Sequence, residues 1–113
     1  MARHINSSIV LFAGHVLALL TCAGTALADD SAAWLQRFLA EADRGHCIEG
    51  AVYNAIRENG AGSATAVVQS ALRALDQRAE QQRALGCAGD IAAQAIDAGA
   101  DPDAVLAATA AGL

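Results

Sequence analysis

The sequence predicts a small all-α protein, a bundle of about five helices stapled by one disulfide bond. Apolar residues recur at helical spacing along most of the chain, and the alternation of period two that marks strands is absent. Cys47 and Cys87 each fall eight residues before an Ala-Ile pair that a glycine-centred break follows. We therefore expect an N-terminal helix and two duplicated helical hairpins, with a period of about 40 residues that is typical of helical-pair repeats.

Residues 1–28 have the layout of a secretory signal peptide. Arg3 precedes an apolar stretch over residues 9–23, and Ala26-Leu27-Ala28 forms a small-x-small cleavage site. We expect cleavage between Ala28 and Asp29. The apolar stretch is shorter than the ~20 residues that a membrane-spanning helix needs, so no membrane span is expected after cleavage.

Cys22 offers an alternative route of export, lipidation at its thiol. Thr21 is larger than the residue expected immediately before a lipidated cysteine, which favours the soluble product. The expected location is the periplasm or the extracellular space.

Residues 29–113 form the mature chain, which is long enough for a single domain. It retains two of the three cysteines, and an even count in an exported chain predicts one disulfide, Cys47 to Cys87. Its six arginines against twelve acidic residues, with no lysine, give a net charge of −6 when His46 is neutral. Nucleic acid and anionic membranes are bound by clustered Lys and Arg, so neither is an expected partner.

The N-terminal segment, residues 29–46, contains a predicted helix that Ser31 caps and that ends near Arg44-Gly45. Its apolar face is the most hydrophobic of the chain, and we expect the aromatic residues of this face and of the next helix to lie in the core. These aromatic residues are Trp34, Phe38 and Tyr53.

The first hairpin, residues 47–86, begins with a helix from about Cys47 to Asn59, and Gly60 ends that helix in a left-handed conformation. Ser63 is the expected cap of the next helix. This second helix extends to Leu85 and stops before Gly86, although residues 76–83 are polar on nearly every side.

The second hairpin, residues 87–113, begins with a predicted helix over residues 88–98, which Gly99 breaks. Asp101 then caps a final helix, and Pro102 takes its first position, where the missing N–H costs nothing.

Metal and catalytic sites are not expected. His46 adjoins Cys47, but with Cys87 only three good ligands exist and a structural zinc site needs about four. A serine nucleophile would depend on His46 as its base, and Ser70 has no nucleophile-elbow context. No cofactor is expected either.

Function is therefore expected to reside in the surface. A domain of this length has little volume for a cleft of ~300 Å³ or more, so a protein partner is the natural object of recognition. The leading hypothesis is a non-enzymatic interaction module that binds another envelope or secreted protein. The alternatives are a self-associating structural or matrix component of the cell envelope and, third, a small hydrolase or redox enzyme.

Overall fold

The computed structural model describes residues 31–112, which belong to one compact unit and contain helices, turns and coil without any strand. The predicted signal peptide and its cleavage site at Ala28 and Asp29 lie outside these residues. After a helix over residues 31–43, the chain forms α2 (Ile48–Asn59), the 3-10 helix η1 (Ala61–Ser63), α3 (Ala64–Gln77), α4 (Ala79–Ala84), α5 (Ile91–Asp97) and α6 (Pro102–Gly112). The predicted all-α fold is confirmed. The separate helix α4 was not predicted.

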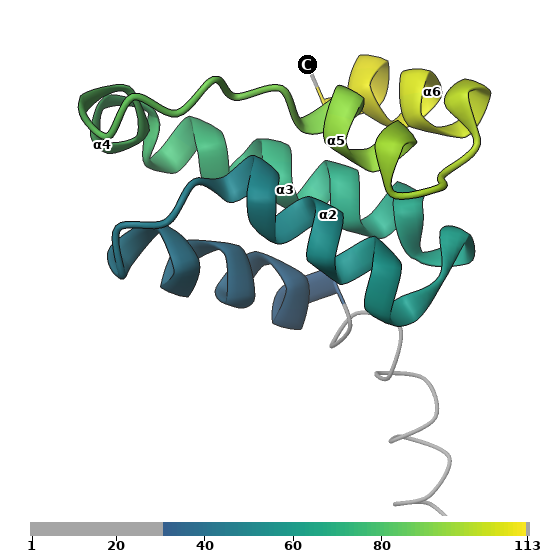
Figure 1. Ribbon diagram of the computed structural model, residues 1–113, viewed down its shortest axis with the longest axis horizontal. Helices are drawn as coiled ribbons and strands as arrows, with labels where there is room; N and C mark the ends of the chain where they lie inside the picture. The colour runs from purple at the N-terminus through teal and green to yellow at the C-terminus, as the bar shows by residue number, and fades with distance from the viewer. Residues whose placement is uncertain (1–30, 113) are drawn as a thin grey trace, which may run out of the picture. The chain divides into compact units, whose positions relative to one another are not determined.

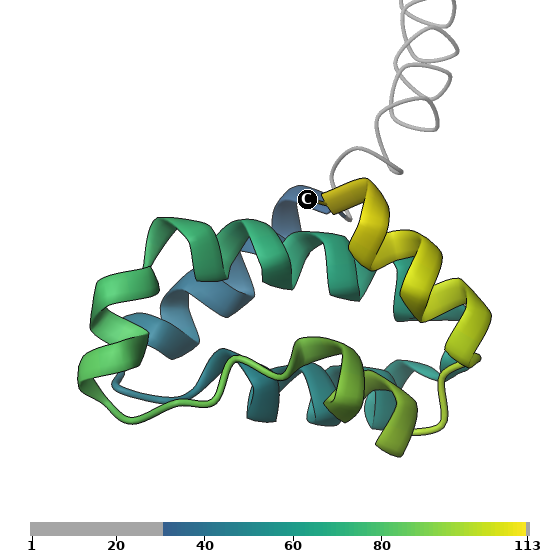
Figure 2. The same cartoon turned by 90° about the horizontal axis from the view of Figure 1, so that it is seen from above.

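The hairpin of α2 and α3 lies between the helix over residues 31–43 and the hairpin of α5 and α6 (Figure 1). In the second hairpin, α5 packs on α2 and α6 packs on α3. The view from above shows α6 along the end of α3 (Figure 2). The first hairpin is therefore covered on two sides, whereas the second is covered on one.

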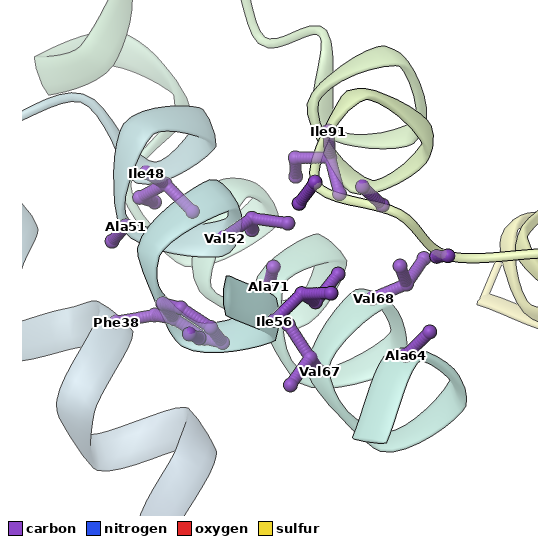
Figure 3. Close-up of a cluster of buried hydrophobic side chains, with 14 of the residues drawn as sticks. Phe38, Ile48, Ala51, Val52, Ile56, Ala64, Val67, Val68, Ala71 and Ile91 are labelled. Carbon is purple, nitrogen blue, oxygen red and sulfur yellow. The ribbon is translucent and has the colours of Figure 1, made fainter. Parts of the chain in front are cut away.

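The core consists of the facing apolar stripes of α2 and α3, which the first helix and the second hairpin complete (Figure 3). In α2 the buried apolar residues recur every three or four positions, which places them on one face of the helix. Alanines from both helices are buried in this core beside the larger side chains. The largest apolar side chains that are fully buried are Phe38, Ile48, Val52, Ile56, Val67, Val68, Ile91 and Val105.

Glycines and one proline end and begin the helices of both hairpins as expected. Gly60 has a φ of +89° after α2, and Gly99 has a φ of +110° after α5. Both values lie where an L side chain is disfavoured. Pro102 is the first residue of α6, and the carboxylate of Asp101 accepts the N–H of Ala104 at 3.2 Å, which confirms the predicted cap.

The continuous helix predicted up to Leu85 is wrong, because it breaks at Arg78. This residue has φ −122° and ψ 24°, outside the helical region. The guanidinium of Arg78 donates to Asp43 at 3.0 Å, and the side-chain amide of Gln81 donates to the carbonyl of Ala42 at 2.7 Å. The polar segment therefore turns to bind the end of the first helix instead of extending α3.

The helix predicted over residues 88–98 begins later, at Ile91. Residues 87–90 are coil, and Gly89 within them has a φ of +71°. The N–H of Ala88 donates to the side chain of Glu49 at 3.0 Å, a long-range bond that holds this segment against α2. The first hairpin has no such coil, because α2 starts directly after Cys47.

Two predicted serine caps are also wrong. Ser63 makes no side-chain bond to the start of α3, and its hydroxyl donates instead to the carbonyl of Gly60 at 2.7 Å. Ser31 is itself helical, so it is not the residue that precedes the first helix. The side chain of Ser63 was expected to accept a free N–H of α3, and it does not do so.

The aromatic side chains lie only partly in the core. Phe38 is fully buried, whereas Trp34 and Tyr53 are half-buried. The rings of Trp34 and Phe38 stack with their centroids 6.1 Å apart, and the guanidinium of Arg37 lies 5.4 Å from the centre of the Trp34 ring. Cation and aromatic ring attract each other in this geometry.

Within residues 31–112, no helix combines the length and the apolar character that crossing a membrane requires.

Candidate functional site

A disulfide joins Cys47 and Cys87, the two cysteines that the sequence paired. Their Cα atoms are 5.5 Å apart, within the range that disulfide geometry allows. Cys47 is the residue directly before α2, and Cys87 begins the coil after α4. The bond therefore ties the start of the first hairpin to the start of the second.

Each cysteine follows a helix that ends in the same type of turn. The N–H groups of Gly45 and His46 bond to carbonyls in the last turn of the first helix, at 2.9 and 3.0 Å. Gly86 and Cys87 do the same at the end of α4, at 3.0 Å each. This pair of bonds around a glycine of positive φ is the Schellman motif, and it reverses the chain at both places.

Gln82 connects the two turns from the inside of the protein. Its side chain is only 2 % exposed, and its oxygen accepts the N–H of Ile48 at 2.9 Å. Its amide nitrogen donates to the carbonyl of His46 at 3.0 Å, and its own carbonyl accepts the N–H of Cys87 at 3.0 Å. Gln82 thereby supplies the cap of α2, because the side chain of Cys47 makes no capping bond.

Glu49 lies beside the disulfide and is 8 % exposed. One carboxylate oxygen accepts the N–H of Ala88, and the other is buried without a hydrogen-bond partner. A carboxylate oxygen of Glu49 and the sulfur atoms of Cys47 and Cys87 all lie within 4.8 Å of one another. We name Cys47, Cys87 and Glu49, together with Gln82, the disulfide corner.

Glu49 and Gln82 were not predicted from the sequence. An acidic residue in the first turn of a helix is typical of a solvated position that favours the helix dipole, which gives no sign of burial. Gln82 belongs to a polar stretch that reads as surface. Each residue is buried by a partner about 35 to 40 positions away, and no local pattern reports such a contact.

His46 lies outside this corner and is exposed, as expected for a polar residue near a helix start. Its Nδ1 lies 2.7 Å from a carboxylate oxygen of Glu41, and Arg44 pairs with the other oxygen of that carboxylate. The hydrogen bond with His46 lowers the pKa of Glu41; partial desolvation opposes this shift, and the charge of Arg44 adds to it. The ion cluster is thus a surface feature at the end of the first helix.

Ser70 and the neighbouring acids Glu41 and Asp43 all have structural partners. The hydroxyl of Ser70 donates to the carbonyl of Ser31 at 3.4 Å. Asp43 pairs with Arg78, whereas Glu41 pairs with His46 and Arg44, so the two neighbouring acids serve different contacts.

Among the described residues, two surface hollows exceed the ~300 Å³ that was not expected in a domain of this length. One of about 380 Å³ lies next to the disulfide and is lined by residues of the first helix and α2, including Arg37, His46, Cys47 and Asn54. The other, of about 450 Å³, lies beside α3 and is lined by Leu72, Leu75 and neighbouring residues. The first hollow gives solvent an approach to the side of Cys47.

Comparisons with models of known protein families, with curated proteins and with solved structures found no significant match for this chain.

Proposed function

We propose that this chain is an exported, non-enzymatic interaction module that binds another envelope or secreted protein through the outward face of α6. The proposal is supported by the exposed apolar side chains of α6. The remainder of the molecule acts as a rigid support for that helix.

The observation that carries the proposal is the apolar outer surface of α6. Leu106 is 61 % exposed, the largest exposed fraction among the exposed large hydrophobic side chains of the described residues. The alanines that share its side of the helix are exposed as well, and Asp103 is the one charged residue between Pro102 and Gly112. A helix that is apolar on all sides usually has all sides covered. In α6 the inner side packs on α3, and the outer side is free to meet a partner.

Other helices show the usual amphipathic arrangement. The outer side of α2 carries Asn54, Arg57 and Glu58, all exposed. Such a face is well solvated and needs no partner. The contrast between α2 and α6 is what singles out α6 as the recognition surface.

The proposal includes export and duplication. Export is supported by the signal-peptide pattern of residues 1–28 and by a disulfide, which persists in oxidising compartments. Duplication is supported by the order helix, glycine break, helix in both hairpins and by the packing of α5 on α2 and α6 on α3. Two stacked hairpins would form a scaffold of the solenoid type, with a free face on its last helix.

Self-association is the second candidate, and the same face favours it. Alanine-rich helix surfaces allow close approach of two copies. Sizing chromatography over a concentration series separates the candidates, because the interaction module should remain monomeric alone and a matrix component should grow in size.

The test of the proposal is partner capture from the native envelope with a matched pair of variants. Leu106→Glu places a charge in the centre of the α6 face and should abolish capture. Leu85→Glu changes another exposed leucine, 46 % exposed and at the end of α4, and should leave capture unchanged. Both variants should retain the helical circular dichroism of the wild type. Equal capture by wild type and Leu106→Glu would refute the proposed surface.

The enzymatic alternative has its own test. His46→Ala removes the histidine on which a hydrolase or redox mechanism would depend, and the interaction module should bind its partner as before. Loss of function in this variant with intact helicity would favour the enzymatic reading.

A further inference from the structure

We propose that the disulfide corner is a redox-gated metal site: when the disulfide is reduced, Cys47, Cys87 and Glu49 bind one soft divalent cation such as zinc. The inference is independent of the partner that α6 binds. It concerns the state of the chain before the disulfide forms or after it is reduced.

The three ligands are already assembled. Their donor atoms lie within 4.8 Å of one another, although Cys87 comes from a different part of the chain than Cys47 and Glu49. Zinc bonds of roughly 2.3 Å to sulfur and 2.0–2.2 Å to oxygen place tetrahedral ligands roughly 3.5–3.8 Å apart. The carboxylate therefore needs only a small movement, and the sulfur atoms need only to separate after reduction.

The unsatisfied, buried carboxylate oxygen of Glu49 is the observation that points to a cation. One of its two carboxylate oxygens is buried without a hydrogen-bond partner, and leaving a buried acceptor unsatisfied is costly. A disulfide has no hydrogen to donate, so the oxidised corner does not satisfy this oxygen. A cation between the two thiolates would satisfy it directly.

The surroundings of the ligands also fit a metal site. The N–H of Ala88 fixes the other oxygen of Glu49, and this bond orients the carboxylate in the way that outer contacts orient metal ligands. The side-chain oxygen of Gln82 accepts the N–H of Ile48, and its backbone carbonyl accepts the N–H of Cys87, so one residue holds the backbone beside both cysteines. These bonds do not depend on the S–S bond and would hold the ligands in place after reduction.

The ligand set also determines the kind of cation and its coordination. Two thiolates favour zinc, cobalt or copper over magnesium and calcium, which prefer oxygen ligands. Three protein ligands leave one position of a tetrahedron for water or another small ligand. His46 is not required for that position, because its imidazole is engaged by Glu41 outside the corner.

Reduction converts the disulfide into two thiols that can bind a metal. A dithiol reductant supplies two electrons and two protons, the S–S bond breaks, two thiols form and the reductant leaves as its own disulfide. The divalent cation then displaces the two thiol protons and binds the resulting thiolates together with the carboxylate of Glu49. A small-molecule disulfide reverses the step: it accepts two electrons and leaves as two thiolates, the bond between Cys47 and Cys87 re-forms, and the cation is released. Metal affinity therefore reports the redox state.

Cobalt(II) titration of the reduced full-length mature chain tests the proposal. The expected result is one equivalent of cobalt with thiolate-to-metal charge-transfer bands, which zinc then displaces. The oxidised chain should show neither the bands nor the binding. Calorimetry with zinc gives the affinity of each variant.

A matched pair of variants tests whether the carboxylate of Glu49 is a metal ligand. Glu49→Gln keeps the acceptor for the N–H of Ala88 but removes the charge, and it should weaken zinc binding roughly tenfold or more. Glu58→Gln changes an exposed acid on the same helix and should leave the affinity unchanged. Equal affinity in the wild type and Glu49→Gln, or the same cobalt bands in the oxidised chain, would overturn the proposal.

Circular dichroism keeps the test valid if reduction loosens the fold. In that case zinc should restore the helical signal of the reduced wild type, because metal binding and folding are coupled. The reduced Glu49→Gln variant should need a roughly tenfold higher zinc concentration for the same recovery. Recovery at the same concentration in both chains would contradict a role of Glu49 as ligand.

Discussion

The two hairpins follow a similar order of elements but differ in how they are buried. In the first hairpin α2 has 12 residues, whereas α5 has seven. Ile56 and Ile96 stand at corresponding places of the sequence pattern, yet Ile56 is 1 % exposed and Ile96 is 38 % exposed. The first hairpin is packed on two sides and the second on one, so position in the stack decides burial where the local pattern is the same.

The difference separates the hairpin that forms most of the core from the hairpin that carries the proposed recognition face. The first supplies most of the core through its valine and isoleucine side chains. The second buries mainly alanines and exposes Ile96 and Leu106. A hairpin that contributes less to the core has more surface available for recognition.

Removal of the disulfide that links the two hairpins should have the largest effect on the stability of the fold. A bridge over 40 positions restricts the unfolded chain by about 4 kcal/mol. The double variant Cys47→Ser with Cys87→Ser should melt roughly 15–30 °C below the oxidised wild type. Thermal unfolding followed by circular dichroism, with a metal chelator present, measures the difference. Equal melting temperatures would show that the bridge does not constrain the fold.

Truncation of the two corresponding isoleucines, one in each hairpin, should lower the free energy of unfolding by different amounts. Ile56→Ala leaves a cavity in the core and should destabilise the protein by about 2–5 kcal/mol. Ile96→Ala removes a partly exposed side chain and should cost about 1 kcal/mol. Urea unfolding of the two variants gives both values. Similar losses at the two positions would contradict the unequal burial described above.

The two hairpins also differ in how their first helices are capped. The side chain of Gln82 caps α2 by a long-range bond, and α5 has no side-chain cap. Gln82→Ala leaves the N–H of Ile48 and the carbonyl of His46 without their buried partner, and it should cost about 2 kcal/mol. Gln77→Ala, at an exposed position of α3, is the control and should change stability by less than about 0.5 kcal/mol. Chemical denaturation of both variants would show whether the contacts of Gln82 matter for stability.

Removal of the charge of Glu41, which pairs with His46 and Arg44, should have the smallest effect on stability. Because the folded pKa of Glu41 lies below its usual value of 4.5, its contribution is present above pH 4.5 and is lost as the pH falls through the folded pKa. The pair is partly solvated, so Glu41→Gln should cost less than about 0.5 kcal/mol at pH 7. The gap between wild type and variant should shrink below pH 4.5 in denaturation experiments. A gap that widens in acid would mean that the sign of the pKa shift is wrong.

The sequence predicted those features that depend on nearby residues. The apolar stripe of α2, the positive φ of Gly60 and the start of α6 at Pro102 all follow from local stereochemistry and spacing. The pairing of Cys47 with Cys87 followed from the count of cysteines in a chain predicted to be exported.

Features made by distant partners were not predictable in this way. The break at Arg78 is accompanied by bonds from Arg78 and Gln81 to the first helix, and the late start of α5 depends on the bond between Ala88 and Glu49. The burial of Glu49 beside the disulfide has the same origin. A polar residue gives no local sign that a partner about 40 positions away will bury it.

Amide hydrogen exchange of the oxidised wild type, resolved by residue, tests the unequal hairpins most directly. We expect the slowest exchange in the buried turns of α2 and α3, around Val52–Ile56 and Val67–Ala71, and faster exchange throughout α5 and α6. Equal protection in both hairpins, or the strongest protection in α6, would contradict the view that the first hairpin is the core and the second the recognition surface.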